Sequence, residues 1–183
     1  VVCPRPLRVG SWRREGIFAA AGLTGVCLYY LLENIALTFS TASNVGVIVS
    51  ASPLFAALLT LALSRGKEHP GWRFFGGFAL SMAGICLISF TGSRLALDWR
   101  GDLLAVTAAM VWAVYSLLTK HIGTWGYSVV QTTRRTFFYG VLFMLPAAAV
   151  MEFRLGPERF LQLDNTAMLL YLGLGACAAC FVT

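Results

Sequence analysis

The fold is decided by one apolar stretch, IFAAAGLTGVCLYYLLENIALT, at Ile17–Thr38. A helix needs about 20 consecutive and mostly apolar residues to cross the hydrocarbon core of a bilayer. This stretch has that length, and Glu33 is its one charged side chain. It therefore predicts a transmembrane helix that carries an acidic group at membrane depth.

Five further stretches share this apolar character, so we expect the chain to cross a membrane repeatedly. They are Ala42–Leu63, Trp72–Thr91, Asp102–Thr119, Ser128–Val150 and the stretch from Ala167 to the end of the chain. In hydrocarbon every backbone polar group must be bonded within the protein, and the sequence lacks the short alternating strands of a barrel. We therefore predict an all-α, polytopic membrane protein.

Composition indicates that the lipid bilayer is the main partner of this surface. Hydrophobic residues make up 58% of the chain and charged residues 12%, too few to cover a soluble domain of 183 residues. The net charge of +6 comes from short clusters between apolar stretches, which do not form the continuous basic face that nucleic acid requires. No glycine-rich ATP loop occurs, and His69 and His121 lack neighbouring metal ligands. We expect no cofactor, no metal site and no nucleic acid partner.

Basic residues recur on alternate connections between the predicted helices. Arg13 precedes the first helix, Lys67 follows the second, and Arg134 lies near the start of the fifth. If the helices alternate in direction, these residues lie on one side, which the positive-inside rule makes cytoplasmic. We expect a multi-pass protein of the bacterial cell (inner) membrane, in which Arg134 and Arg135 are topology anchors rather than substrate contacts.

The first and sixth predicted helices have similar small-residue patterns in opposite orientations. Residues 22–30 read GLTGVCLYY, and residues 173–181 read GLGACAACF. Inverted repeats of this kind build many secondary transporters. Repeat logic predicts a complete protein of about ten helices and roughly 300 residues, with two helices missing at each end of this chain. These missing helices of the same chain are expected partners.

Four motifs resemble one transporter family. The motifs ENIALTFSTASN at Glu33–Asn44 and SASPLF at Ser50–Phe55 look like the third and fourth helices of EamA-type members of the drug/metabolite transporter superfamily. The motif GDLLAVTAAMVWAVY at Gly101–Tyr115 is similar to the start of the family's second repeat. The motif TRRTFFYG at Thr133–Gly140 is similar to its seventh helix.

The resemblance implies a ten-helix carrier with two inverted five-helix repeats, of which this chain supplies helices three to eight. Residues 1–93 would be the C-terminal part of the first EamA repeat, with helices three to five. Residues 94–183 would be the N-terminal part of the second repeat, with helices six to eight. The resemblance also implies transport of small metabolites, amino acids or drugs.

Glu33 is the main candidate for a substrate or coupling site. A carboxylate inside an apolar helix costs roughly 3 kcal/mol on insertion scales. Steps of three and four residues place Gly22, Gly25, Tyr29 and Glu33 on one helix face. Tyr29 and Glu33 are therefore candidates to bind a cationic group or a proton in a central pathway. The alternative is a structural carboxylate bonded to a neighbouring helix or to the outer headgroups.

Other candidates lie on the second and fourth predicted helices. Asn44 adds an amide and Ser50 a hydroxyl to one side of the second helix. Pro53 lacks a backbone N–H, so it predicts a kink with a free carbonyl that could face a cavity; simple packing is the alternative. Trp112 and Tyr115 lie in the middle of the fourth helix, where they line a cavity or act as interfacial anchors.

Together these features favour a secondary transporter, an exporter or permease that moves small molecules by alternating access. A structural or assembly membrane protein without transport activity is the first alternative. An intramembrane enzyme is a weaker one, because no H-E-x-x-H motif occurs and Glu33 has no evident acidic or histidine companion. We therefore expect a protein that is not an enzyme.

Overall fold

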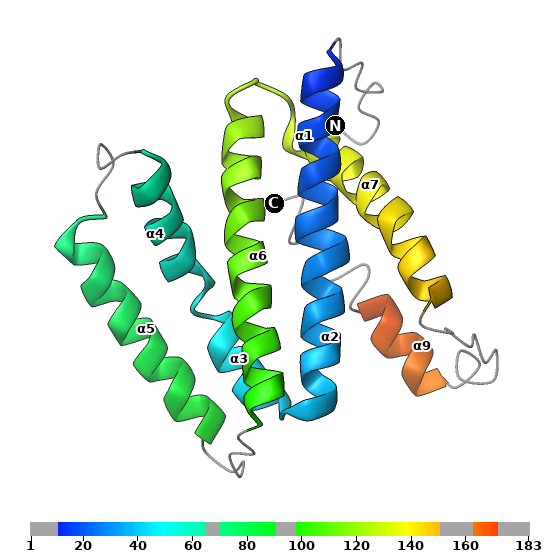
Figure 1. Cartoon of the computed structure of the whole chain (residues 1–183). Helices are drawn as coiled ribbons and strands as arrows, with labels where there is room; N and C mark the ends of the chain where they lie inside the picture. The colour runs from blue at the N-terminus through cyan, green and yellow to red at the C-terminus, as the bar shows by residue number, and fades with distance from the viewer. Residues whose placement is uncertain (1–10, 65–69, 91–97, 151–162, 172–183) are drawn as a thin grey trace.

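A computed structural model describes residues 11–64, 70–90, 98–150 and 163–171, and within these ranges it contains helices and no strands (Figure 1). The elements are α1 (Trp12–Gly22), η1 (Leu23–Leu28), α2 (Tyr29–Phe39), α3 (Ala42–Val49), α4 (Ser52–Leu63), α5 (Trp72–Phe90), α6 (Trp99–Gly123), α7 (Val129–Val150) and α9 (Leu163–Leu170). The predicted all-α fold is confirmed. The last predicted helix, from Ala167, lies mostly outside the described residues.

Three helical spans are long and apolar enough to cross a membrane. They are Trp12–Phe39, Ala42–Leu63 and Trp99–Gly123, with mean hydropathies of 1.5, 2.1 and 1.6. The helix Trp72–Leu87 is apolar but shorter. Repeated spans of this length make the chain a multi-pass membrane protein, as predicted.

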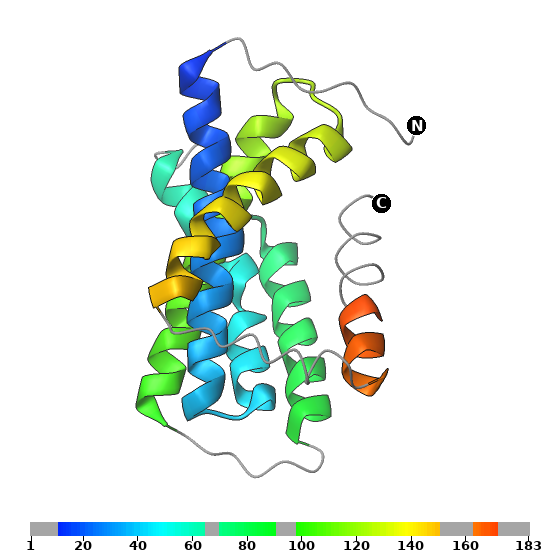
Figure 2. The same cartoon turned by 90° about the vertical axis from the view of Figure 1, so that its right-hand side faces the viewer.

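The helix α6 is the centre of the arrangement. The span formed by α1, η1 and α2 runs beside it, α4 packs on another side of it, and α7 crosses α1 and η1 (Figures 1 and 2). The helix α5 packs on α3, at the edge of the molecule. Small buried residues allow α6 to approach its neighbours, as where Ala36 of α2 and Val45 of α3 gather with Ala105 of α6.

The first span contains one π-helical segment, η1, between its two α-helical parts. Gly25 lies against the ring of Tyr115, and the tilted rings of Tyr29 and Trp112 have centroids 4.7 Å apart. A π turn has i→i+5 hydrogen bonds and holds one residue more than an α-helical turn. It lies between the part of the span where Gly22 meets α7 and the part where Tyr29 meets α6. Nothing in the apolar pattern predicts this segment.

The predicted row of Gly22, Gly25, Tyr29 and Glu33 does not meet one partner. Gly22 faces α7, where a Cβ atom would lie 2.6 Å from the Thr136 carbonyl oxygen and 2.7 Å from the Gly140 nitrogen. Gly25 and Tyr29 face α6 instead. The expectation of a single shared face is therefore wrong between Gly22 and Gly25.

The second predicted stretch is broken in its middle rather than continuous. The helix α3 ends at Val49, and α4 begins at Ser52 with Pro53 in its first turn. Proline is tolerated there because the first N–H groups of a helix have no intrahelical partner. The kink predicted at Pro53 is thus confirmed, in the stronger form of a break between two short helices.

Candidate functional site

Four aromatic rings gather where α2 meets α6, and we call them the aromatic cluster: Tyr29, Tyr30, Trp112 and Tyr115. Ring centroids are 5.3 Å apart for Tyr29 and Tyr30, and 5.0 Å apart for Trp112 and Tyr115. The Tyr29–Trp112 contact joins the two pairs across the helix interface. Tilted rings at these separations stabilise one another. Three of the predicted site residues, Tyr29, Trp112 and Tyr115, are therefore brought together.

Glu33 lies one turn beyond Tyr29 on the same helix, and the Tyr29 hydroxyl and the Glu33 carboxyl group interact electrostatically. Glu33 is partly buried, and it forms no ion pair with any other residue that the structure describes. Its carboxyl group therefore lies beside aromatic rings and a hydroxyl, and no described cation is paired with it.

Asn44 occupies a different place from the aromatic cluster. Its buried side-chain amide donates to the Asp102 carboxylate at 2.5 Å and to the Ser40 hydroxyl at 2.9 Å. Asp102 is at the start of α6, ten residues before Trp112, which corresponds to about 15 Å along the helix. The amide of Asn44 thus connects the α2–α3 turn to α6 at one end of the protein.

Ser50 and Pro53 line a cavity of about 510 Å³ between the α3–α4 break and α5. The Ser50 hydroxyl donates to the Val47 carbonyl oxygen at 2.6 Å and lies 3.4 Å from the Met82 sulfur. On the α5 side the wall is formed mainly by apolar side chains, with Arg73 at one end. The predicted site residues therefore fall in three separate places.

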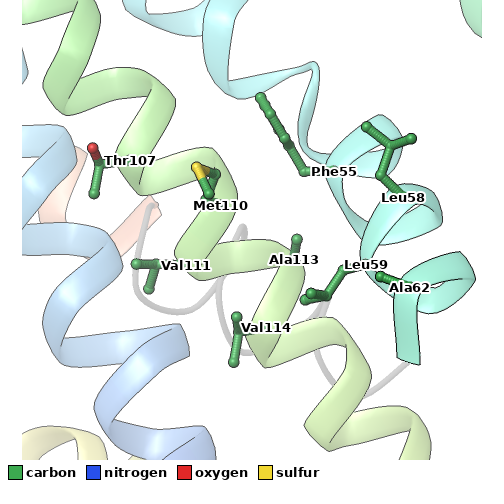
Figure 3. A pocket seen from close by; sticks show the side chains of 9 residues that line it. All are labelled: Phe55, Leu58, Leu59, Ala62, Thr107, Met110, Val111, Ala113 and Val114. Carbon is green, nitrogen blue, oxygen red and sulfur yellow. The ribbon is translucent and has the colours of Figure 1, made fainter.

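A second cavity, of about 570 Å³, lies between α4 and α6 and was not predicted (Figure 3). Phe55 and Leu58 contribute from α4, while Met110 and Val114 contribute from α6. Its wall is almost entirely apolar, so it offers no group for acid–base chemistry. Leucine and valine are so frequent in the apolar stretches that no sequence signal marks these residues.

An ion pair at the other end of the first span was also missed. Arg135 of α7 donates to one Glu15 carboxylate oxygen from Nε at 3.0 Å and from Nη2 at 2.5 Å. The Tyr139 hydroxyl bonds to the same oxygen. The Arg135 side chain is 34% exposed and the Glu15 side chain 17%. Because Glu15 and Arg135 are 120 residues apart, no local pattern relates them.

Arg14 extends this polar region toward the α6–α7 connection. Its guanidinium donates to the Tyr127 hydroxyl at 3.0 Å and lies 5.3 Å from the centre of the Trp125 ring. Phe18, which is fully buried, packs against both aromatic rings. Among the described residues no three His, Cys, Asp or Glu side chains gather as a metal site requires.

Comparison with known proteins shows that the chain is similar to transporters. Residues 4–90 match the EamA-like transporter family. An uncharacterized transporter of Archaeoglobus fulgidus is 32% identical over 90% of this chain and 54% of its own length. The Bacillus subtilis uncharacterized transporter YdfC is 28% identical over 84% of the chain and 48% of its length.

A third relative carries a more specific name. The probable terminal-alkyne amino-acid exporter of Streptantibioticus cattleyicolor is 28% identical over 91% of the chain and 54% of its own length. The chain thus spans about half the length of the curated relatives it matches. No solved structure is significantly similar to it. Residues 4–90 thus identify this part of the chain with the EamA-like transporter family.

Proposed function

We propose that the complete protein is a secondary transporter that moves small molecules by alternating access, and that Glu33 binds a cationic group of the substrate or a coupling proton. The family match and the three transporter or exporter names among its relatives support a carrier rather than an enzyme. Its substrates are small metabolites, amino acids or drugs.

The observation that carries this proposal is the environment of Glu33. The carboxylate lies within an apolar membrane span, less than two turns before α2 ends at Phe39. Among the described residues it forms no ion pair, and the Tyr29 hydroxyl interacts with it electrostatically. An ionisable group held at such depth costs about 3 kcal/mol and is by default a sign of function.

The aromatic cluster supplies a second element of recognition beside the carboxylate. Tyrosine and tryptophan faces attract cations, with about 0.5–1 kcal/mol at exposed sites and about 2 kcal/mol where water is excluded. Tyr29 contacts Trp112 and interacts electrostatically with Glu33 one turn further on, so the rings and the carboxyl group adjoin. The name of the Streptantibioticus relative makes amino acids, which carry an ammonium group, the first class to test.

Alternating access would involve contacts between the two predicted repeats, residues 1–93 and 94–183. Glu15 and Arg135 join them at one end of the protein, and Asn44 and Asp102 join them at the other. A carrier that opens to one side at a time separates one of these ends while keeping the other closed. With Arg13, Lys67 and Arg134 on the cytoplasmic side of the bacterial inner membrane, the Glu15–Arg135 pair would be the inner contact.

The test is flux through the complete protein reconstituted in liposomes, with a panel of labelled amino acids and cationic metabolites. We expect Glu33→Gln to abolish accumulation driven by a pH gradient and Glu33→Asp to retain part of it. Asn34→Ala is the matched control, because that exposed side chain bonds only the Tyr30 carbonyl oxygen of its own helix. Unchanged flux in Glu33→Gln at every pH would remove Glu33 from the mechanism. Absence of flux for every solute would favour the structural or assembly role instead.

A further inference from the structure

The cavity between α5 and the α3–α4 break has the form of a groove, which we call the α5 groove. Its α5 wall is built from residues at helical steps of three and four, among them Phe74, Phe78, Met82 and Ile85. Ser50 and Pro53 close it on the side of the break. The helix α5, which packs on α3, lies at the edge of the helix arrangement in Figure 1, and the groove runs along this helix.

The length of the α5 groove matches one leaflet of a bilayer. From Arg73 to Ile85 the helix α5 rises about 18 Å, at 1.5 Å per residue. Half of a typical hydrocarbon core is about 15 Å. The groove therefore extends from the headgroup level at Arg73 to the depth of the bilayer midplane, where Ser50 meets Met82.

The two ends of the α5 groove differ in chemistry as the two ends of a lipid do. Arg73 is exposed, and it forms no ion pair with another described residue. Its neighbour Trp72 is 86% exposed, as expected for an aromatic anchor at the membrane interface. Beyond them the wall is mainly apolar as far as Ile85, with the Ser81 hydroxyl as a polar group on the α5 side. A guanidinium above an apolar channel is complementary to a phosphate above an acyl chain.

We propose that the α5 groove binds one anionic phospholipid, with an acyl chain along Phe74, Phe78 and Met82 and the phosphate paired with Arg73. On the predicted orientation this lipid belongs to the cytoplasmic leaflet, which is the leaflet that carries anionic headgroups. The site does not depend on the proposed transport function, because none of its contacts involves Glu33 or the aromatic cluster.

Native mass spectrometry of the complete protein tests this site. The purified protein is incubated with equal amounts of phosphatidylglycerol and phosphatidylcholine that carry identical acyl chains. We expect the wild-type protein to retain phosphatidylglycerol preferentially, and Arg73→Gln to reduce that preference about fivefold, the effect typical of one basic residue at an anionic surface. Arg134→Gln is the matched control, since Arg134 is also exposed and also predicted to be cytoplasmic but lies on α7.

A second variant tests the acyl-chain part without changing charge. Gly77 lines the groove, and a Cβ atom there would have no heavy atom within 4 Å, so Gly77→Leu fills the groove without displacing a neighbour. We expect it to lower retention of phosphatidylglycerol while the protein stays folded, as judged by its melting temperature. Wild-type retention in both Arg73→Gln and Gly77→Leu, or an equal loss in Arg134→Gln, would overturn the proposal.

Discussion

Arg135 of α7 holds Glu15 of α1 through two N–H groups that donate to the same carboxylate oxygen. The pair is partly buried. The attraction between its charges is therefore less screened by solvent than in an exposed ion pair, and the charges cost less to desolvate than in a fully buried pair. It closes one end of the contact between α1 and α7, next to the glycine contacts of Gly22 and Gly140.

Removing either partner of this pair should destabilise the protein. We expect Glu15→Gln and Arg135→Gln each to cost about 1–2 kcal/mol, between the values of about 0–1 kcal/mol for exposed pairs and about 3–5 kcal/mol for broken buried pairs. The double variant should lose less than the sum, because the partners are coupled. Thermal unfolding in detergent measures this. Additive losses, or an equal loss in Arg134→Gln, would show that the pair is not a unit.

The close approach of α1 to α7 makes Gly22 intolerant of any side chain. A Cβ atom there would meet backbone atoms of Thr136 and Gly140, which cannot rotate away. We expect Gly22→Ala to destabilise the protein by about 1–3 kcal/mol, the usual cost of overpacking. Gly46→Ala in α3 is the control, because no heavy atom lies within 4 Å of its Cβ position. Equal melting temperatures for the two variants would contradict the packing described here.

Asn44 should contribute to stability rather than to substrate binding. Asn44→Ala leaves the Asp102 carboxylate without its buried amide donor, and hydrogen bonds to charged groups contribute about 1.5–3 kcal/mol. We therefore expect a lower melting temperature with an unchanged KM for transport. Asn34→Ala, at an exposed position, should stay within about 0.5 kcal/mol of the wild type. A raised KM in a stable Asn44→Ala protein would instead indicate that Asn44 contributes to substrate binding.

Trp112 should act on substrate affinity through its ring face. If the aromatic cluster receives a cation, Trp112→Leu raises the KM of cationic substrates several-fold, the equivalent of about 1 kcal/mol, and Trp112→Phe raises it less. Trp125→Leu is the control, because that ring lies beside Arg14 at the other end of the span. Flux assays over a range of substrate concentrations measure the effect. A parallel rise in both tryptophan variants would mean a general packing defect.

The sequence predicted the helices better than the contacts between them. Apolar length located the first span and α6, because a membrane fixes how long such a helix must be. The ring contact between Tyr29 and Trp112 was predicted only in part, because both residues were candidates but nothing in the sequence related them to each other. The Glu15–Arg135 pair had no signal, because single-helix periodicity says nothing about a partner on another helix.

The two backbone irregularities, the α3–α4 break and the π turn, also differ in whether the sequence predicts them. Pro53 predicted the break between α3 and α4, because the missing N–H is a property of that single residue. The π turn at Leu23–Leu28 had no such marker, because no proline or other residue type within it distinguishes it from the helix on either side. Side-chain identity therefore predicts the interruption that one residue causes and misses the one without a marker.

Because of the π turn, the side chains at the two ends of the first span do not follow one continuous α-helical spacing. Without this turn, the same residues wound as a regular α-helix would turn everything beyond it by about 100°. Phe18 would keep its place near Ile122, while Tyr29 and Glu33 would swing away from Trp112. The side chains proposed to meet the substrate thus owe their direction to a single surplus residue in the backbone, several turns away from the ion pair at the other end.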